Sequence, residues 1–182
     1  MRKKEISKYY KLEPKMDIKG RVKEEAVYVG GYYDFTDQVF SRANAGSRLF
    51  TTSLLLMALL IIGTFPDGTG LRQVYIALPY ICTLIPAALT VTVGWGFKKA
   101  DGRLTEVEYH DTVLRGKGST TALCILCGYC IVADLIFSIV QFAQITLWKE
   151  ILFIIINIIS LLLSYIQLKY IKVLNKKLTF CE

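Results

Sequence analysis

The sequence predicts an all-α integral membrane protein with four transmembrane helices that form two antiparallel hairpins. Apolar residues make up 53% of the 182 residues and the mean hydropathy is +0.42, above the usual range for soluble domains. Charged residues crowd into the first 48 positions and almost vanish from long stretches between Leu49 and Ile171. Helices are expected because these stretches lack the alternating pattern of barrel strands.

We predict three parts in chain order: an N-terminal leader, a transmembrane domain and a C-terminal tail. Each apolar run approaches or exceeds the ~20 residues that cross ~30 Å of hydrocarbon. Tight connections around residues 66–70 and at Lys149 and Glu150 predict the two hairpins. The predicted bounds are 1–44 for the leader, 45–174 for the transmembrane domain and 175–182 for the tail, with spans at about 45–65, 74–97, 120–147 and 150–171.

The distribution of positive charge predicts the orientation. Of the 22 Lys and Arg residues, all but Arg72 and Lys149 flank the spans on the side that holds both termini and the loop 98–119. The positive-inside rule makes that side cytoplasmic. We therefore expect a protein of the plasma membrane, in a bacterial cell, with its N- and C-termini in the cytoplasm.

Two cytoplasmic segments show local patterns of their own. The aromatic stretch at residues 26–35 predicts a short β-hairpin, and residues 37–45 predict a helix that leads into the first span. In the central loop, Thr105 and Glu108 form a capping-box pattern, and we expect the helix they open to stop at Gly116. This short amphipathic loop helix would lie along the membrane surface.

A buried polar seam is the most informative pattern in the third and fourth spans. Polar or small residues recur there at spacings of three and four, which places each set on one helix face. With the turn at Lys149 and Glu150, the two faces should meet. The candidate binding residues are Asp134, Ser138, Gln141, Asn157, Ser160 and Ser164, with the expected pairs Gln141–Asn157, Ser138–Ser160 and Asp134–Ser164.

Asp134 is the residue of this seam that packing explains least. Interhelical hydrogen bonds between small polar residues are common in membranes and contribute only ~0.6 kcal/mol on average, so the seam as a whole fits a packing role. A charged carboxylate inside the membrane costs ~2.5–3.5 kcal/mol, however, and no Lys, Arg or His is expected there to pair with it. Asp134 is therefore a candidate proton or cation site, or an anchor for a partner's basic residue.

Three cysteines in the third span, Cys124, Cys127 and Cys130, are spaced three apart. No His or further Cys is placed to complete a tetrahedral metal site, and buried cysteine usually packs as a small hydrophobe. We expect no metal, no cofactor and no catalytic residues. A redox role for these thiols remains the weakest of the alternatives.

Three function classes follow, in order of preference. The first is a non-enzymatic membrane subunit or scaffold that contacts another membrane protein or forms a homo-oligomer, because motifs for phosphate binding or nucleophilic catalysis are absent. The second is a small oligomeric transporter or channel that uses a buried carboxylate. The third is an intramembrane thiol redox enzyme. The expected partner is the lipid bilayer and not nucleic acid, because acidic and basic residues are mixed in the leader.

Overall fold

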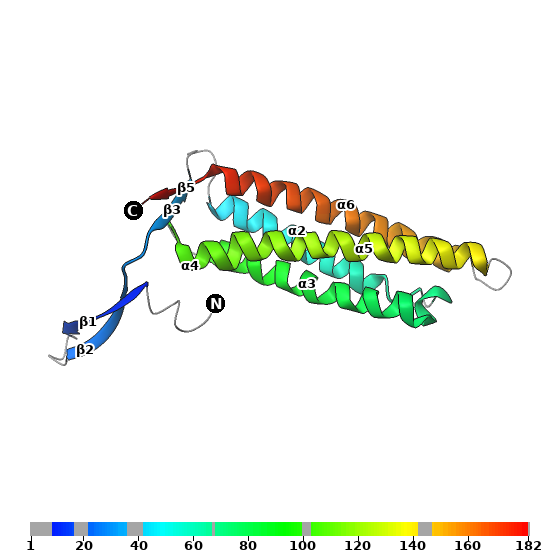
Figure 1. Ribbon diagram of the computed structural model, residues 1–182, viewed down its shortest axis with the longest axis horizontal. Helices are drawn as coiled ribbons and strands as arrows, with labels where there is room; N and C mark the ends of the chain where they lie inside the picture. Colours follow the sequence, from blue (N-terminus) through cyan, green and yellow to red (C-terminus); the bar gives the residue numbers. More distant parts are fainter. Residues whose placement is uncertain are drawn as a thin grey trace.

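The computed structural model is mostly helical, and four of its helices are long and apolar enough to cross a membrane. It describes residues 9–16, 22–35, 42–66, 68–99, 103–141 and 147–181. The long helices are α2 (Arg42–Ile62), α3 (Val74–Lys99), α5 (Arg115–Val140) and α6 (Leu147–Lys177). They lie side by side in one elongated bundle (Figure 1), where α2 contacts α3, α3 contacts α5, α5 contacts α6, and α6 contacts α2.

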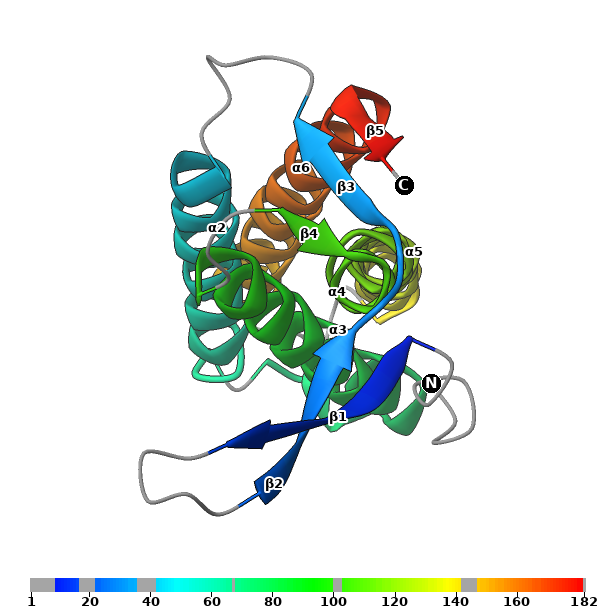
Figure 2. The same ribbon diagram turned by 90° about the vertical axis from the view of Figure 1, so that its left-hand side faces the viewer.

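Five short strands gather at one end of this bundle, which we call the sheet end. They are β1 (Tyr10–Met16), β2 (Val22–Tyr28), β3 (Tyr32–Phe35), β4 (Leu104–Thr105) and β5 (Leu178–Cys181). β3 lies between β4 and β5 and is antiparallel to both, and it crosses in front of the helix ends (Figure 2). β1 and β2 form a separate antiparallel hairpin that projects away from the bundle (Figure 1).

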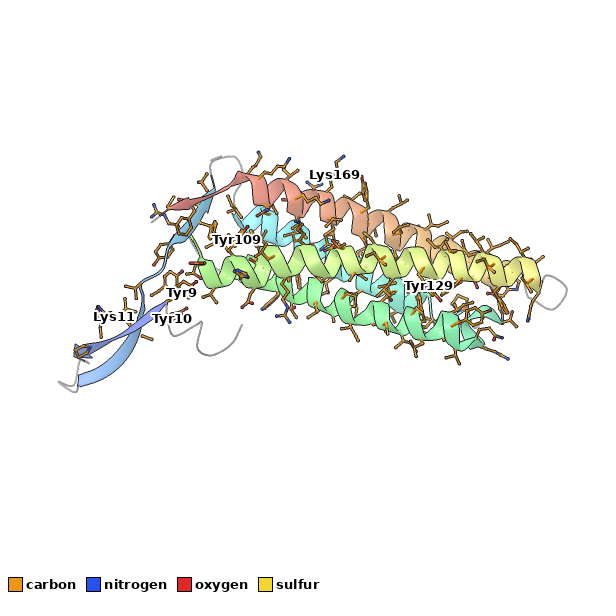
Figure 3. All side chains as sticks on the ribbon, viewed as in Figure 1. Tyr9, Tyr10, Lys11, Tyr109, Tyr129 and Lys169 are labelled. Atoms are coloured by element: carbon orange, nitrogen blue, oxygen red, sulfur yellow. The ribbon has the colours of Figure 1, made fainter. Side chains whose placement is uncertain are left out.

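Aromatic contacts hold the sheet end together. The ring of Tyr33 in β3 stacks on that of Tyr109 at a centroid distance of 4.1 Å, and the Tyr109 hydroxyl donates to Asn175 Oδ1 near the end of α6 at 2.5 Å. The Tyr9 hydroxyl donates to Glu106 Oε1 at 3.0 Å, and Figure 3 labels both Tyr9 and Tyr109. Burial raises the pKa of Tyr33, so its phenol stays neutral. Segments far apart in the sequence are thereby joined at this end.

The predicted β-hairpin within residues 26–35 is wrong. β2 pairs along its length with β1, whereas β3 pairs with β4 and β5, so the two strands in this stretch belong to different sheets. The stretch does contain strands, but β3 pairs with residues more than seventy positions away, and such distant partners leave no local signal in the sequence. The helix predicted over 37–45 falls partly outside the described residues, and α2 begins at Arg42.

The capping box is present, but the predicted helix end is not. Thr105 Oγ1 accepts from the Glu108 amide at 3.2 Å, and Glu108 Oε2 accepts from the Thr105 amide at 3.0 Å. Helix α4 (Glu106–Tyr109) then continues through a π-helical turn, His110–Leu114, directly into α5. An added Cβ at Gly116 would lie 3.0 Å from Val93 Cγ1, so this glycine allows close packing on α3 instead of ending a helix. The described residues of the central loop therefore form no separate surface helix.

The predicted turn at Lys149 and Glu150 is also wrong. α5 ends at Val140, and α6 begins at Leu147, so both charged residues lie in the first turn of α6. A negative side chain is favoured at a helix N-terminus, where the helix dipole is positive. The two residues therefore start the last helix and do not interrupt it.

Two glycines let α2 and α3 approach each other closely near the sheet end. An added Cβ at Gly46 in α2 would lie 2.7 Å from Lys98 Cα, and one at Gly94 in α3 would lie 2.7 Å from Phe50 Cα. Both contacts are to backbone atoms, which cannot move aside as a flexible side chain can. Small residues have this role at many membrane helix interfaces.

We predict that Gly94→Ala lowers the stability of the folded protein by about 1–3 kcal/mol, because the new methyl group forces α2 and α3 apart. The control is Gly128→Ala in α5, where an added Cβ meets no atom within 4 Å. Thermal unfolding in detergent, followed by circular dichroism, measures both. Equal melting temperatures for the two variants would show that the helices do not depend on this contact.

Candidate functional site: a buried pair of carboxylates

Glu150 is almost fully buried although it lies only one turn from the start of α6. Its side chain is 1% exposed, and Oε1 accepts hydrogen bonds from the Thr69 hydroxyl at 2.6 Å and from the Gly70 amide at 3.2 Å. Both donors lie in residues 63–73, which connect α2 to α3 at the end opposite the sheet; we call this the loop end. The loop thus holds one carboxylate in place.

Asp134 of α5 meets Glu150 at the same point. An added Cβ at Gly70 would lie 2.3 Å from Asp134 Oδ1 and 3.0 Å from Glu150 Oε2, so the two carboxylates converge on the face of this glycine. At Gly68 an added Cβ would lie 2.7 Å from Glu150 Oε2. Asp134 itself is 0% exposed. The two glycines give the carboxylates the space they occupy.

Three oxygen atoms of this pair have no hydrogen-bond partner among the described residues: both carboxylate oxygens of Asp134, and Glu150 Oε2. Two neighbouring carboxylates in a low-dielectric site cannot both be ionised without a compensating positive charge. The pair is therefore suited to hold one positive charge, either a proton shared between the oxygens or a small cation. The sequence pattern identified Asp134 as a candidate proton or cation site but did not reveal Glu150 as its neighbour.

A line of buried polar residues continues along α6 from this pair towards the sheet end. It comprises Asn157, Ser160, Ser164 and Gln167, each at most 4% exposed. Near the sheet end of the line, Gln167 Nε2 donates to Ser53 Oγ of α2 at 2.7 Å, and Ser53 Oγ also lies 3.2 Å from the Thr90 carbonyl oxygen of α3. We call these four residues of α6 the inner seam.

The predicted cross-helix pairs are wrong. Asp134 faces Glu150, and Ser164 lies about four turns further along α6, roughly 21 Å away at 1.5 Å per residue. Gln141 is exposed at the end of α5, whereas Asn157 is buried well inside the bundle. Ser138 is half-buried, and its hydroxyl has no partner among the described residues.

The error has a single cause: the turn predicted from the sequence lies about seven residues too late. Because the two helices are antiparallel, this shifts the expected partner on α6 by fourteen residues, from Glu150 to Ser164 opposite Asp134. The spacing of α6 held a signal that would have found Glu150, because stepping back seven residues from Asn157 on the same helix face leads to it. For Thr69 and Gly70 no comparable signal exists, because the contact between a loop and a distant helix depends on the three-dimensional packing.

The three cysteines of α5 lie in or beside the apolar interior of the bundle. Cys127 and Cys130 are fully buried in the bundle, Cys124 is partly buried, and all three are free thiols. Within the described part of the chain, no group of three or more His, Cys, Asp or Glu side chains is arranged to hold a metal ion. The thiols of Cys127 and Cys130 pack with Leu123 and Phe137 in the apolar interior.

Comparison with known proteins gives no match, either to a protein-family model, to a curated protein or to a solved structure. The class of the protein therefore follows from its own fold and site. In the described part of the chain, four helices are long and apolar enough to cross a membrane, and an acidic pair is buried at one end of their bundle.

We predict that Thr69→Val destabilises the loop end by about 1.5–3 kcal/mol, because Glu150 loses a hydroxyl donor to a buried charged group. Thr64→Val is the matched control in the same loop, since the exposed Thr64 hydroxyl donates only to the nearby Ile61 carbonyl. Unfolding in detergent micelles compares the two variants. If Thr69→Val and Thr64→Val unfold alike, the hydrogen bond to Glu150 contributes nothing to stability.

Proposed function

We propose that this chain is a small, non-enzymatic membrane protein that binds and moves protons or small cations, with Asp134 and Glu150 as its binding site. The observation that carries the proposal is the convergence of two buried carboxylates with three unpartnered oxygens. Ionisable groups inside a membrane are costly, and they characteristically belong to ion or proton pathways. The inner seam extends this polar character along the length of α6.

The orientation we propose places the sheet end in the cytoplasm and the loop end on the outer side of the plasma membrane. The positive-inside rule supports it, since Arg48, Lys98 and Lys169 lie near the sheet end (Figure 3 labels Lys169). In this orientation, the carboxylate pair lies near the outer surface and the inner seam leads from it towards the cytoplasm. A charge bound at the pair would then enter from outside.

We expect Asp134→Asn and Glu150→Gln each to reduce charge movement at least about tenfold, because either change removes a carboxylate from the pair. The measurement uses purified protein in liposomes, with a pH-sensitive dye or a sodium-sensitive dye inside and a potassium diffusion potential as driving force. Asp111→Asn, an exposed carboxylate at the sheet end, is the control and should behave as the wild type. Unchanged flux in both pair variants would refute the assignment.

A second candidate function, the membrane subunit or scaffold, is favoured by the β1–β2 hairpin. An isolated two-stranded hairpin is only marginally stable in water, and this one projects away from the bundle (Figure 1). A partner protein or a second copy of the chain would stabilise it. A variant lacking residues 9–28 tests this function. If the chain is a subunit or scaffold, the variant extracted from native membranes should no longer co-purify with a stoichiometric partner, or should no longer have the mass of a homo-oligomer. If the chain only moves ions, its flux should be unchanged.

A further inference from the structure

An aromatic contact separates the carboxylate pair from the inner seam. Phe153 lies on the same face of α6 as Glu150 and Asn157 and between them along the helix, and its side chain is fully buried. Its ring packs on that of Tyr80 of α3, with a centroid distance of 4.9 Å. Cys127 and Cys130 of α5 belong to the same apolar cluster. On the inward face of α6, one apolar residue, Phe153, thus lies between Glu150 and the polar residues of the inner seam.

Beyond this layer, the inner seam holds buried oxygen atoms that accept no hydrogen bond from any described residue. They are Asn157 Oδ1, Ser160 Oγ and Gln167 Oε1. Two side-chain donors beside them have other acceptors, since Asn157 Nδ2 donates to the Phe153 carbonyl at 3.0 Å and Ser164 Oγ to the Ser160 carbonyl at 2.8 Å. Buried acceptors in this situation are characteristically satisfied by ordered water. Water supplies the O–H donors that these oxygens need.

We propose that the inner seam holds a file of water molecules and that the charge carried along it is a proton. The contact between Phe153 and Tyr80 is a hydrophobic gate between this file and the carboxylate pair. This inference rests on the proposed function, because it names the ion and the barrier of the same site. Apolar constrictions close pathways by excluding water, and a broken water file passes no protons.

The proton step balances within the protein and its solvent. When the aromatic contact opens, the O–H bond of the protonated carboxyl group breaks as a new O–H bond forms on the adjacent water. That water passes one of its own protons to the next, and the last water, beside Gln167, releases a proton towards the sheet end, where Ile171 and Leu174 must separate to let it reach solvent. The carboxylate left behind takes up a proton from the outer side, which restores the starting state.

The number of protein ligands favours a proton over a cation such as Ca²⁺. Hard cations such as Ca²⁺ take about six to eight oxygen ligands, whereas the carboxylate pair offers three unpartnered oxygens. The carbonyls of Phe153 and Ser160 along the seam already accept side-chain hydrogen bonds. A proton needs only one oxygen at a time.

A cleft of about 260 Å³ borders Tyr80 and is lined also by Thr64, Leu71, Arg72, Ala77 and Ile81. Pro79 lies next to Tyr80 in α3 and removes an intrahelical hydrogen bond, which favours a local bend. The Tyr80 hydroxyl donates to the Leu60 carbonyl at 2.5 Å, and this hydrogen bond would have to break before the ring could move towards the cleft.

The test measures proton flux in liposomes for four variants, each checked for folding by circular dichroism and gel filtration. Phe153→Ala should raise flux at least about tenfold by removing the apolar barrier, and Phe153→Leu, which keeps an apolar side chain, should stay near the wild type. Asn157→Leu should lower flux because it removes a side chain that binds water in the inner seam. Combining Asp134→Asn with Phe153→Ala should abolish the increase.

A second readout does not depend on transport. The infrared band of the buried carboxyl group shifts when its proton exchanges in D₂O, so the exchange rate reports how readily water reaches the pair. Faster exchange in Phe153→Ala than in Phe153→Leu supports the gate even if no variant moves protons, a result that would defeat the proposed function alone. Flux that requires Asp134 but is unchanged in a folded Phe153→Ala protein overturns the gate and leaves the proposed function standing. Uptake of sodium instead of protons overturns the assignment of the ion.

Discussion

The hydrogen bonds that hold the Glu150 carboxylate to Thr69 and Gly70 set the arrangement on which the rest of the bundle depends. They fix the rotation and height of α6 relative to the loop between α2 and α3. Because successive residues of a helix are rotated by about 100°, a slip of one position would turn the inner seam away from the bundle interior. With Glu150 in place, the residues at spacings of three and four beyond it, among them Phe153 and Asn157, all point inward.

The carboxylate pair is a local weakness that the remaining structure has to offset. Glu150 receives two hydrogen bonds, but Asp134 receives none from the described residues, although both are buried. Stabilisation is concentrated elsewhere, in the aromatic contacts of the sheet end and in the link from Gln167 to Ser53. A buried polar group that is kept without local compensation is typical of a functional position. This contrast supports a role for the pair beyond packing.

Composition was sufficient to predict four apolar helices, because transfer into lipid depends on each segment by itself. The capping box at Thr105 was likewise predictable, since its partners are three residues apart. The sequence predicts the turn between α5 and α6 too late because charged residues usually indicate exposure, whereas Glu150 is buried by contacts from a distant loop. The three-stranded sheet was missed for a related reason, because its strands come from the leader, the central loop and the tail.

The two ends of the bundle are built for different tasks. At the sheet end, backbone contacts at Gly46 and Gly94 bring α2 and α3 together, and β3 joins the central loop to the C-terminal strand. At the loop end, α2 and α3 are linked through side chains, chiefly by the Tyr80 hydroxyl and the Leu60 carbonyl. Side-chain contacts rearrange more readily than close backbone contacts. Movement at the carboxylate pair would therefore pivot about the sheet end, with the helices separating first where the aromatic contact lies.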